Sequence, residues 1–234
     1  MALGQHRIEY EVIEGWEQMP EGWAFVEVAG VACDSQDRVY VFNRGTHPMI
    51  VFDKEGKFLN AWGEPGRGPG QFILPHGIAL DGAGQVYVAD RENSRVQIFS
   101  PAGEYLREWT FLNRPYDIFI DDQDMLHIAE GGFLNYMHKR AEEPLPGHDQ
   151  TMIYPPCGHS PIARVTVCDP DGRIASQIGG ENPVLPGNFV APHGIWADRR
   201  GDLYVGEVVV QAGAVKRMAP LRPAAFQKFR RRAG

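Results

Sequence analysis

The chain has 234 residues, 43% of them hydrophobic and 23% charged, so it is long enough to build a full core. Its net charge of −7 argues against a nucleic-acid backbone as the main partner. The sequence has no apolar run long enough to span a membrane, and its N-terminus shows no signal-peptide pattern. Three cysteines without a CxxC pair favour a reducing compartment, so we expect a cytoplasmic location.

Residues 8–16 (IEYEVIEGW) predict a first strand, and from residue 29 onward the chain repeats one pattern. Each copy has a short apolar strand, an Asp/Gly turn and a second strand that ends in a polar residue. The residue that opens the copy and the polar residue that closes it are 14 apart, at 29 and 43, 76 and 90, 116 and 130, and 193 and 207. Hairpin-linked strands in repeats of about 40 to 50 residues are typical of β-propeller blades.

We therefore predict one all-β domain over residues 1–234, with four recognisable blades at about 29–62, 75–109, 115–178 and 192–229. An insertion at 131–163, rich in Gly, Pro and His, interrupts the third blade, and a loop of this length is a candidate lid. The fourth blade lacks an outer strand. We expect strand 8–16 to supply it and to close the ring, because propellers avoid exposed edges.

The first strand of each blade lines the central channel, so the residue that opens it lies at the channel mouth. These residues are Ala29, His76, Tyr116 and His193. Neutral imidazole is a preferred zinc ligand, so His76 and His193 are candidate metal ligands, one short of the usual three. The alternative is that the two histidines form hydrogen bonds across the channel mouth.

Two arginines follow the second strands of the first two blades. Arg44 could bind a substrate carboxylate through its guanidinium, or it could form a salt bridge to Glu207 or Glu130. Arg91 occupies the same place in the second blade, where we expect it to bridge to a neighbouring blade. His127 aligns with tyrosines at packing positions, which predicts a core substitution.

Four motifs carry a resemblance to a known family: FNRGTHP, GPGQFILPHGIALD, VADRENSRVQIF and FVAPHGIWADRRGDLYVGEV. They resemble NHL-repeat propellers and, more narrowly, the peptidyl-α-hydroxyglycine α-amidating lyase family. The resemblance implies a six-bladed ring, a zinc ion held by channel histidines, and an arginine and a tyrosine that carry the reaction. It places Arg44, His76 and His193 at family site positions. The third zinc histidine and the tyrosine belong to two blades that this chain lacks, and Gly194 replaces an aspartate, which argues against the family's calcium ion.

The resemblance implies metal-dependent cleavage of a carbinolamide, N–CH(OH)–COOH, to an amide and glyoxylate, with an impaired site. Arg44 would orient the carboxylate, and Tyr116 is the channel phenol that could act as the base. The expected ligand is a small or peptide-like carboxylate, with no nucleic acid or membrane partner. The alternative is a non-catalytic NHL scaffold that binds a peptide or protein partner.

Overall fold

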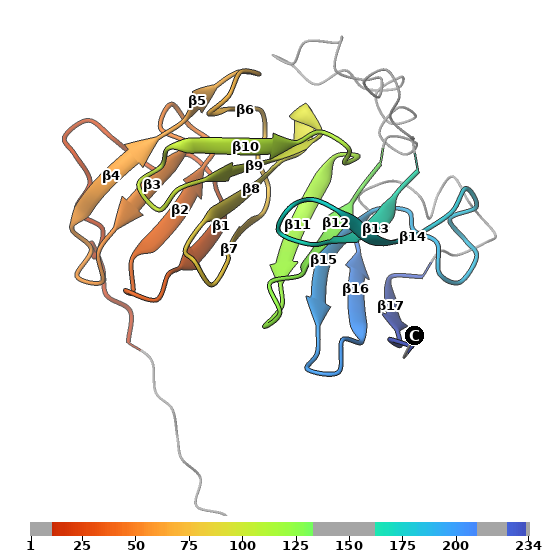
Figure 1. Cartoon of the computed structure of the whole chain (residues 1–234). Coiled ribbons are helices and arrows are strands. Elements are labelled where there is room, and N and C mark those ends of the chain that lie inside the picture. The colour runs from red at the N-terminus through yellow and green to blue at the C-terminus, as the bar shows by residue number, and fades with distance from the viewer. Residues whose placement is uncertain (1–10, 133–161, 210–223, 233–234) are drawn as a thin grey trace, which may run out of the picture.

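The computed structural model describes residues 11–132, 162–209 and 224–232, and these residues form an all-β propeller of four blades (Figure 1). Its one helical element in the described ranges is the 3-10 turn η1 (Arg91–Asn93). The predicted fold class is therefore confirmed. No helix among these residues has the length and apolar character needed to cross a membrane.

Each blade is an antiparallel meander whose first strand lies innermost. The first blade contains β1 (Val28–Cys33), β2 (Val39–Asn43), β3 (Met49–Phe52) and β4 (Phe58–Trp62). The second contains β7 (Ile78–Leu80), β8 (Val86–Asp90), β9 (Arg95–Phe99) and β10 (Tyr105–Trp109). The third contains β11 (Pro115–Ile120), β12 (Leu126–Glu130), β13 (Arg164–Cys168) and β14 (Ile174–Ile178).

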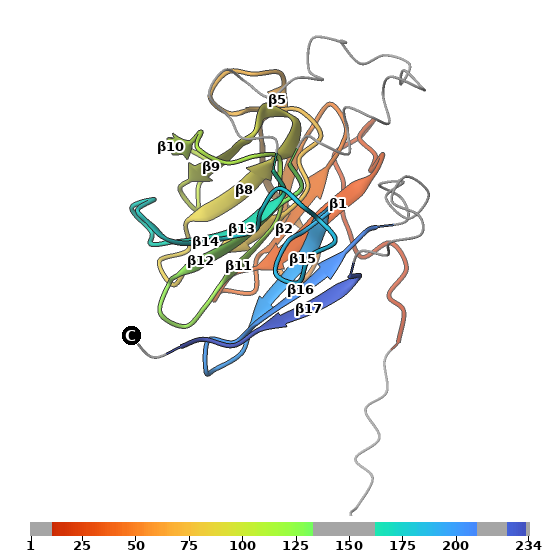
Figure 2. The same ribbon diagram turned by 90° about the vertical axis from the view of Figure 1, so that its right-hand side faces the viewer.

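The described part of the fourth blade has three strands, β15 (Pro192–Ala197), β16 (Leu203–Glu207) and β17 (Phe226–Phe229). A short parallel pair, β5 (Glu64–Pro65) and β6 (Gln71–Phe72), connects the first two blades. Contacts between inner strands run from β1 to β7, from β7 to β11 and from β11 to β15. Figure 2 shows β15 beside β11 from a second direction.

The polar residue that ends the second strand of each blade makes the same hydrogen bond in all four copies. Its side chain accepts a hydrogen bond from the backbone N–H of the residue 17 positions earlier, where the chain enters the blade. The four pairs are Val26 with Asn43, Ile73 with Asp90, Asn113 with Glu130, and Val190 with Glu207. A buried backbone donor must be paired, which explains why the repeat keeps a polar residue at this place.

The hydrophobic core consists of layers between neighbouring blades. One cluster, with Phe42 and Val86, joins the first and second blades. A second, with Tyr87 and Ile118, joins the second and third, and a third, with Val165 and Val205, joins the third and fourth. Among the described residues no core cluster joins the fourth blade to the first.

The expected closure of the ring by residues 8–16 is not what the structure shows. Residues 8–10 lie outside the described ranges, and residues 11–16 form no strand. The chain that follows packs on the first blade, where the Gln18 N–H donates to Gly56 O (2.8 Å) and the Trp16 indole N–H donates to Lys54 O (3.2 Å). The apolar side chains of this segment, Trp16 and Phe25 among them, pack against Phe52, so the segment covers the first blade and does not extend the fourth blade.

The insertion expected at 131–163 falls almost wholly on residues outside the described ranges. The prediction of a lid there, and the histidines and cysteine it contains, cannot be located in the structure.

Candidate active site

Three of the four inner strands begin with a β-bulge at the position the sequence places at the channel mouth. The strand register shifts between Val28 and Gly30 in β1, between Pro115 and Asp117 in β11, and between Pro192 and Gly194 in β15. The extra residue in each case is the one that opens the repeat: Ala29, Tyr116 or His193. A bulge leaves its residue out of the ladder and re-aims its side chain.

The rings of His76, Tyr116 and His193 converge there. Their centroids are separated by 4.6 Å between the two imidazoles, 4.8 Å between His76 and Tyr116, and 5.2 Å between Tyr116 and His193. The two imidazoles meet edge to face, with an interplanar angle of 86°. Three of the four predicted channel residues, His76, Tyr116 and His193, therefore form one cluster, which is called the channel-mouth cluster below.

Gly77 allows the close approach of β7 and β11 that builds this cluster. A Cβ atom at Gly77 would lie 2.8 Å from the carbonyl oxygen of Tyr116 and 3.0 Å from Cα of Asp117. Both atoms belong to the backbone, so neither can move aside without shifting the strand. The absence of a side chain at this position keeps His76 against Tyr116.

The tautomer of His76 follows from its hydrogen bond. Nδ1 lies 2.9 Å from the carbonyl oxygen of Tyr116, and a carbonyl can only accept, so Nδ1 carries the proton and donates. Nε2 then has a free lone pair. Burial lowers the pKa of His76 to about 3, and the charges of Arg91, His193 and Arg44 add to the decrease. His76 is therefore a neutral imidazole near pH 7.

His193 is also held neutral. Burial lowers its pKa, the carboxylate of Asp117 opposes the decrease, and Arg91 adds to it. Asp117 stands in the third blade where the other three blades carry glycine. Its Oδ2 accepts the backbone N–H of Ile195 (3.2 Å) and so ties β11 to β15.

The arginine that follows the second strand is near the cluster in both of the first two blades. Arg44 Nε donates to Pro75 O (3.3 Å), the residue before His76, and its Nη1 pairs with Glu27 (3.2 Å). The proposed salt-bridge alternatives, Glu207 and Glu130, are not its partners, because both point inward to their own blade entries. Glu27 is two-thirds exposed, so this ion pair is weak and leaves the guanidinium available to an anion.

Arg91 belongs to the site, although the sequence pattern suggested only a bridge between blades. Its Cζ lies 5.0 Å from the centroid of the Tyr116 ring, and its Nε pairs with Glu92 (2.9 Å). Glu92 also pairs with Arg114 (2.6 Å), whose Cζ is 5.7 Å from the same ring. The equivalence of Arg91 with Arg44, 47 residues apart, was the signal that could have placed Arg91 here. The signal for Asp117 is that it stands where the other three repeats carry glycine.

The fit of this cluster to a zinc ion is incomplete. His76 has the backbone hydrogen bond on its second ring nitrogen that metal-binding histidines commonly make. However, the described residues contain no group of three or more His, Cys, Asp or Glu side chains that could hold a metal ion.

Comparison with known proteins agrees with the propeller architecture. The model of the family DUF5128, described as a 6-bladed beta-propeller, matches residues 25–146. Protein brain tumor of Drosophila melanogaster is 34% identical over 68 residues, which are 29% of this chain and 6% of that protein.

Two solved structures share the fold over most of this chain. A protein of unknown function from Bacteroides caccae has 13% identity and a TM-score of 0.56, with 87% of this chain and 63% of that chain covered. A catalytically inactive histidine-to-alanine variant of virginiamycin B lyase from Staphylococcus aureus, solved with quinupristin, has 13% identity and a TM-score of 0.55. That comparison covers 92% of this chain and 59% of the lyase. The chain thus spans less than two thirds of the length of each of these proteins.

Proposed function

The chain belongs to this family of six-bladed β-propellers, and we propose that its channel-mouth cluster is the active site of a lyase that acts on a small carboxylate. The observation that carries the proposal is the convergence of two neutral imidazoles and a phenol beside Arg44 and Arg91. A neutral imidazole can accept a proton near pH 7, and a guanidinium binds a carboxylate. Binding and proton transfer are thus provided within one cluster.

The residues divide these tasks by their chemistry. Arg44, whose partner Glu27 is exposed, anchors the substrate carboxylate. His193 is half-buried and neutral, and it acts as the base. His76, with its Nδ1 proton donated to a carbonyl, presents Nε2 as an acceptor that orients the substrate hydroxyl. Tyr116 can donate and accept through its hydroxyl, and it relays the proton to the leaving group.

The finer form of the proposal is the reaction that the sequence resemblance implies. A base removes the hydroxyl proton of R–CO–NH–CH(OH)–COO⁻, the carbon–oxygen double bond forms, and the carbon–nitrogen bond breaks. The proton then passes to the nitrogen, which yields R–CO–NH2 and glyoxylate. The atoms balance without water or an oxidant, so acid–base groups are sufficient. In this scheme Tyr116 is a proton relay rather than the base.

The likeness to virginiamycin B lyase supports the reaction class. That protein is a lyase on the same fold, and its inactive variant lacks one histidine. At 13% identity the comparison alone establishes the fold, so the reaction class assigned to this chain depends on its own histidines.

Zinc remains a proposal of its own. If an ion binds, His76 and His193 would hold it, and a bound zinc ion supplies Lewis-acid activation of an oxygen ligand. Metal analysis of the purified protein, compared with a His76→Ala/His193→Ala variant, tests this. An equal zinc content in the two proteins would reject the site.

The proposed function is tested by measuring glyoxylate release from α-hydroxyhippurate, with and without added zinc. We expect slow turnover that falls roughly 10²–10⁴-fold in His193→Ala. In Arg44→Gln we expect KM to rise because the carboxylate loses its anchor. Arg200→Gln is the control, because Arg200 is exposed in a turn at the other end of β15.

Two outcomes would lead to different conclusions. The absence of glyoxylate under all conditions would reject the lyase. If the substrate still bound in an Arg44-dependent manner, the chain would instead be the non-catalytic binding scaffold of the alternative hypothesis.

A further inference from the structure

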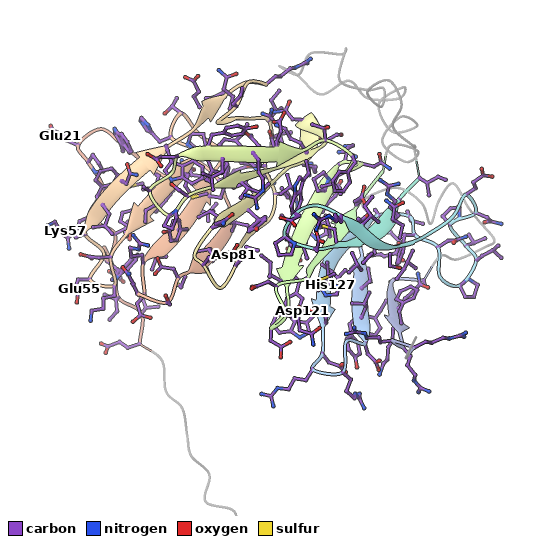
Figure 3. The ribbon with its side chains drawn as sticks, viewed as in Figure 1. Glu21, Glu55, Lys57, Asp81, Asp121 and His127 are labelled. Atoms are coloured by element: carbon purple, nitrogen blue, oxygen red, sulfur yellow. The ribbon has the colours of Figure 1, made fainter. Side chains whose placement is uncertain are left out.

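A second candidate site lies far from the channel mouth, between the third and fourth blades. A partly open pocket of about 430 Å³ is lined there by apolar side chains such as Val167, Ile178 and Phe229, and by His127, Asp121 and residues 230–232. Asp121 follows the end of β11, whereas Tyr116 lies at its beginning. Five residues of extended chain separate the two places by about 16 Å. Figure 3 shows Asp121 and His127 together at this end of the third blade.

The pocket occurs at the one described blade interface where a repeated tryptophan is missing. Trp62 ends the first blade and lies against Gly103 of the second, and Trp109 ends the second and lies against Gly172 of the third. The equivalent residue of the third blade is Ile178. The smaller side chain leaves a volume that the indole fills at the other two interfaces.

His127 is the second substitution at this interface. In the other three blades the equivalent residue is a tyrosine whose hydroxyl donates to an aspartate of the preceding turn, over 3.1–3.4 Å. His127 Nε2 lies 3.0 Å from Asp121 Oδ2, so it keeps this contact with a smaller ring. The imidazole is 6% exposed, and its Nδ1 is buried with no hydrogen-bond partner among the described residues. An unpaired buried nitrogen costs free energy, so a structural role alone does not explain the histidine.

The third feature of the pocket is its charge. After the third strand the first three blades continue with Asp53, Ser100 or Asp169, whose side chains accept backbone N–H groups of the next turn. The fourth blade continues instead with Arg230, Arg231 and Arg232, which line the pocket. No ion pair joins any of these three side chains to an acid within the described ranges. The carboxylate of Asp121 is already engaged by His127 and by the N–H groups of Gln123 and Met125.

We propose that this pocket binds a small organic anion, with its acid group on the arginines and its apolar body in the space next to His127 and Ile178. Guanidinium groups that have no acidic partner among the described residues are suited to carboxylate or phosphate. The apolar wall selects for a ligand with a hydrophobic body, and 430 Å³ is within the range of small-molecule sites. The site does not depend on the chemistry at the channel mouth.

Binding can be tested with three probes on the full chain: benzoate, phenyl phosphate and the neutral isostere benzamide. We expect both anions to bind at millimolar concentration by saturation-transfer NMR, and benzamide to bind about tenfold more weakly because it cannot form a charge-assisted bond. The stronger of the two anions identifies the acid group. Equal binding of benzamide and benzoate, or no binding of either anion, would overturn the proposal.

Two variants locate the site. His127→Tyr installs the residue of the other three blades, so it keeps the bond to Asp121 while filling the pocket. Arg230→Gln/Arg232→Gln removes charge from the rim. Each is expected to weaken anion binding about tenfold or more without lowering Tm, whereas Arg199→Gln/Arg200→Gln, which removes the same charge from an adjacent turn, leaves binding unchanged. Unchanged binding in both pocket variants would refute the assignment.

Discussion

His76 couples the channel mouth to the stability of the whole protein. Its folded-state pKa of about 3 is below its ordinary value of 6.5. Between these two pH values the unfolded chain therefore binds a proton at this histidine that the folded chain does not bind. The stabilising effect of the neutral ring is therefore complete above pH 6.5 and is lost as the pH falls toward 3. The chemistry that makes this histidine a free acceptor also makes the fold sensitive to acid.

The first prediction follows from this linkage. Between pH 7.5 and pH 5 the wild-type protein should lose about 2 kcal/mol of unfolding free energy that His76→Gln does not lose. Urea unfolding at the two pH values measures the difference. Carboxylates that titrate in this range are common to both proteins and cancel. Parallel pH profiles for the two proteins would show that His76 is not held neutral by the fold.

The second prediction concerns Arg91, whose charge lowers the pKa of both channel histidines. Replacement by glutamine should raise the pKa of His76 and of His193, as followed by the imidazole C–H signals in an NMR titration. Arg200→Gln should leave the pKa values of His76 and His193 unchanged, since Arg200 follows the end of β15 whereas His193 lies at its beginning. If Arg91→Gln shifts neither signal, Arg91 is not part of the electrostatic environment of the site.

At the scale of strands, the site depends on how closely one inner strand approaches the next. Gly77 and Gly194 occupy equivalent places in the second and fourth blades but meet different surroundings. A Cβ atom at Gly77 would meet backbone atoms of β11, whereas a Cβ atom at Gly194 would have nothing within 4 Å. The same residue type is thus required in one blade and free to change in the other.

The third prediction is that alanine has different effects at Gly77 and at Gly194. Gly77→Ala should lower the unfolding free energy by about 1–3 kcal/mol and should reduce any turnover, because β7 must move away from β11. Gly194→Ala should be nearly neutral. Thermal unfolding of both variants gives the comparison, and equal losses of Tm would contradict the close approach of β7 and β11.

The comparison of sequence and structure shows what a repeat can and cannot reveal. A constant spacing of 14 residues predicts the blades and the channel positions, because each copy has the same strand packing and the same hydrogen bond at the blade entry. It singles out Arg91, as the equivalent of Arg44, and Asp117, as the acid where the other blades carry glycine. It does not show that both lie beside the channel histidines, because that depends on which blades are neighbours. Residues 11–16 of the expected closing strand form no strand, and the residues after them pack on the first blade. A β-period pattern does not specify which edge of which blade a segment covers.

At the scale of the whole molecule, the four blades formed by the described residues have two end faces that no other described blade covers. Residues 16–25 cover the face of the first blade, where Trp16 and Phe25 lie with ring centroids 5.7 and 6.3 Å from that of Phe52. Behind them Ile50 and Phe52 are fully buried. The segment thus shields apolar surface that a blade would shield in a larger ring. On the fourth blade Trp196 and Phe226 remain largely exposed.

The last prediction tests whether the segment replaces a blade. Trp16→Ser/Phe25→Ser should lower the unfolding free energy by at least about 2 kcal/mol, because the covering side chains and the surface beneath them lose apolar burial. The exposed surface should also promote self-association, which light scattering after size-exclusion chromatography detects. Val12→Ser/Ile13→Ser is the matched control, since these two residues lie just before this segment in the chain but are 80% and 64% exposed. A loss of stability in the control equal to that in Trp16→Ser/Phe25→Ser would mean that the segment acts through its general hydrophobicity and not by covering the first blade.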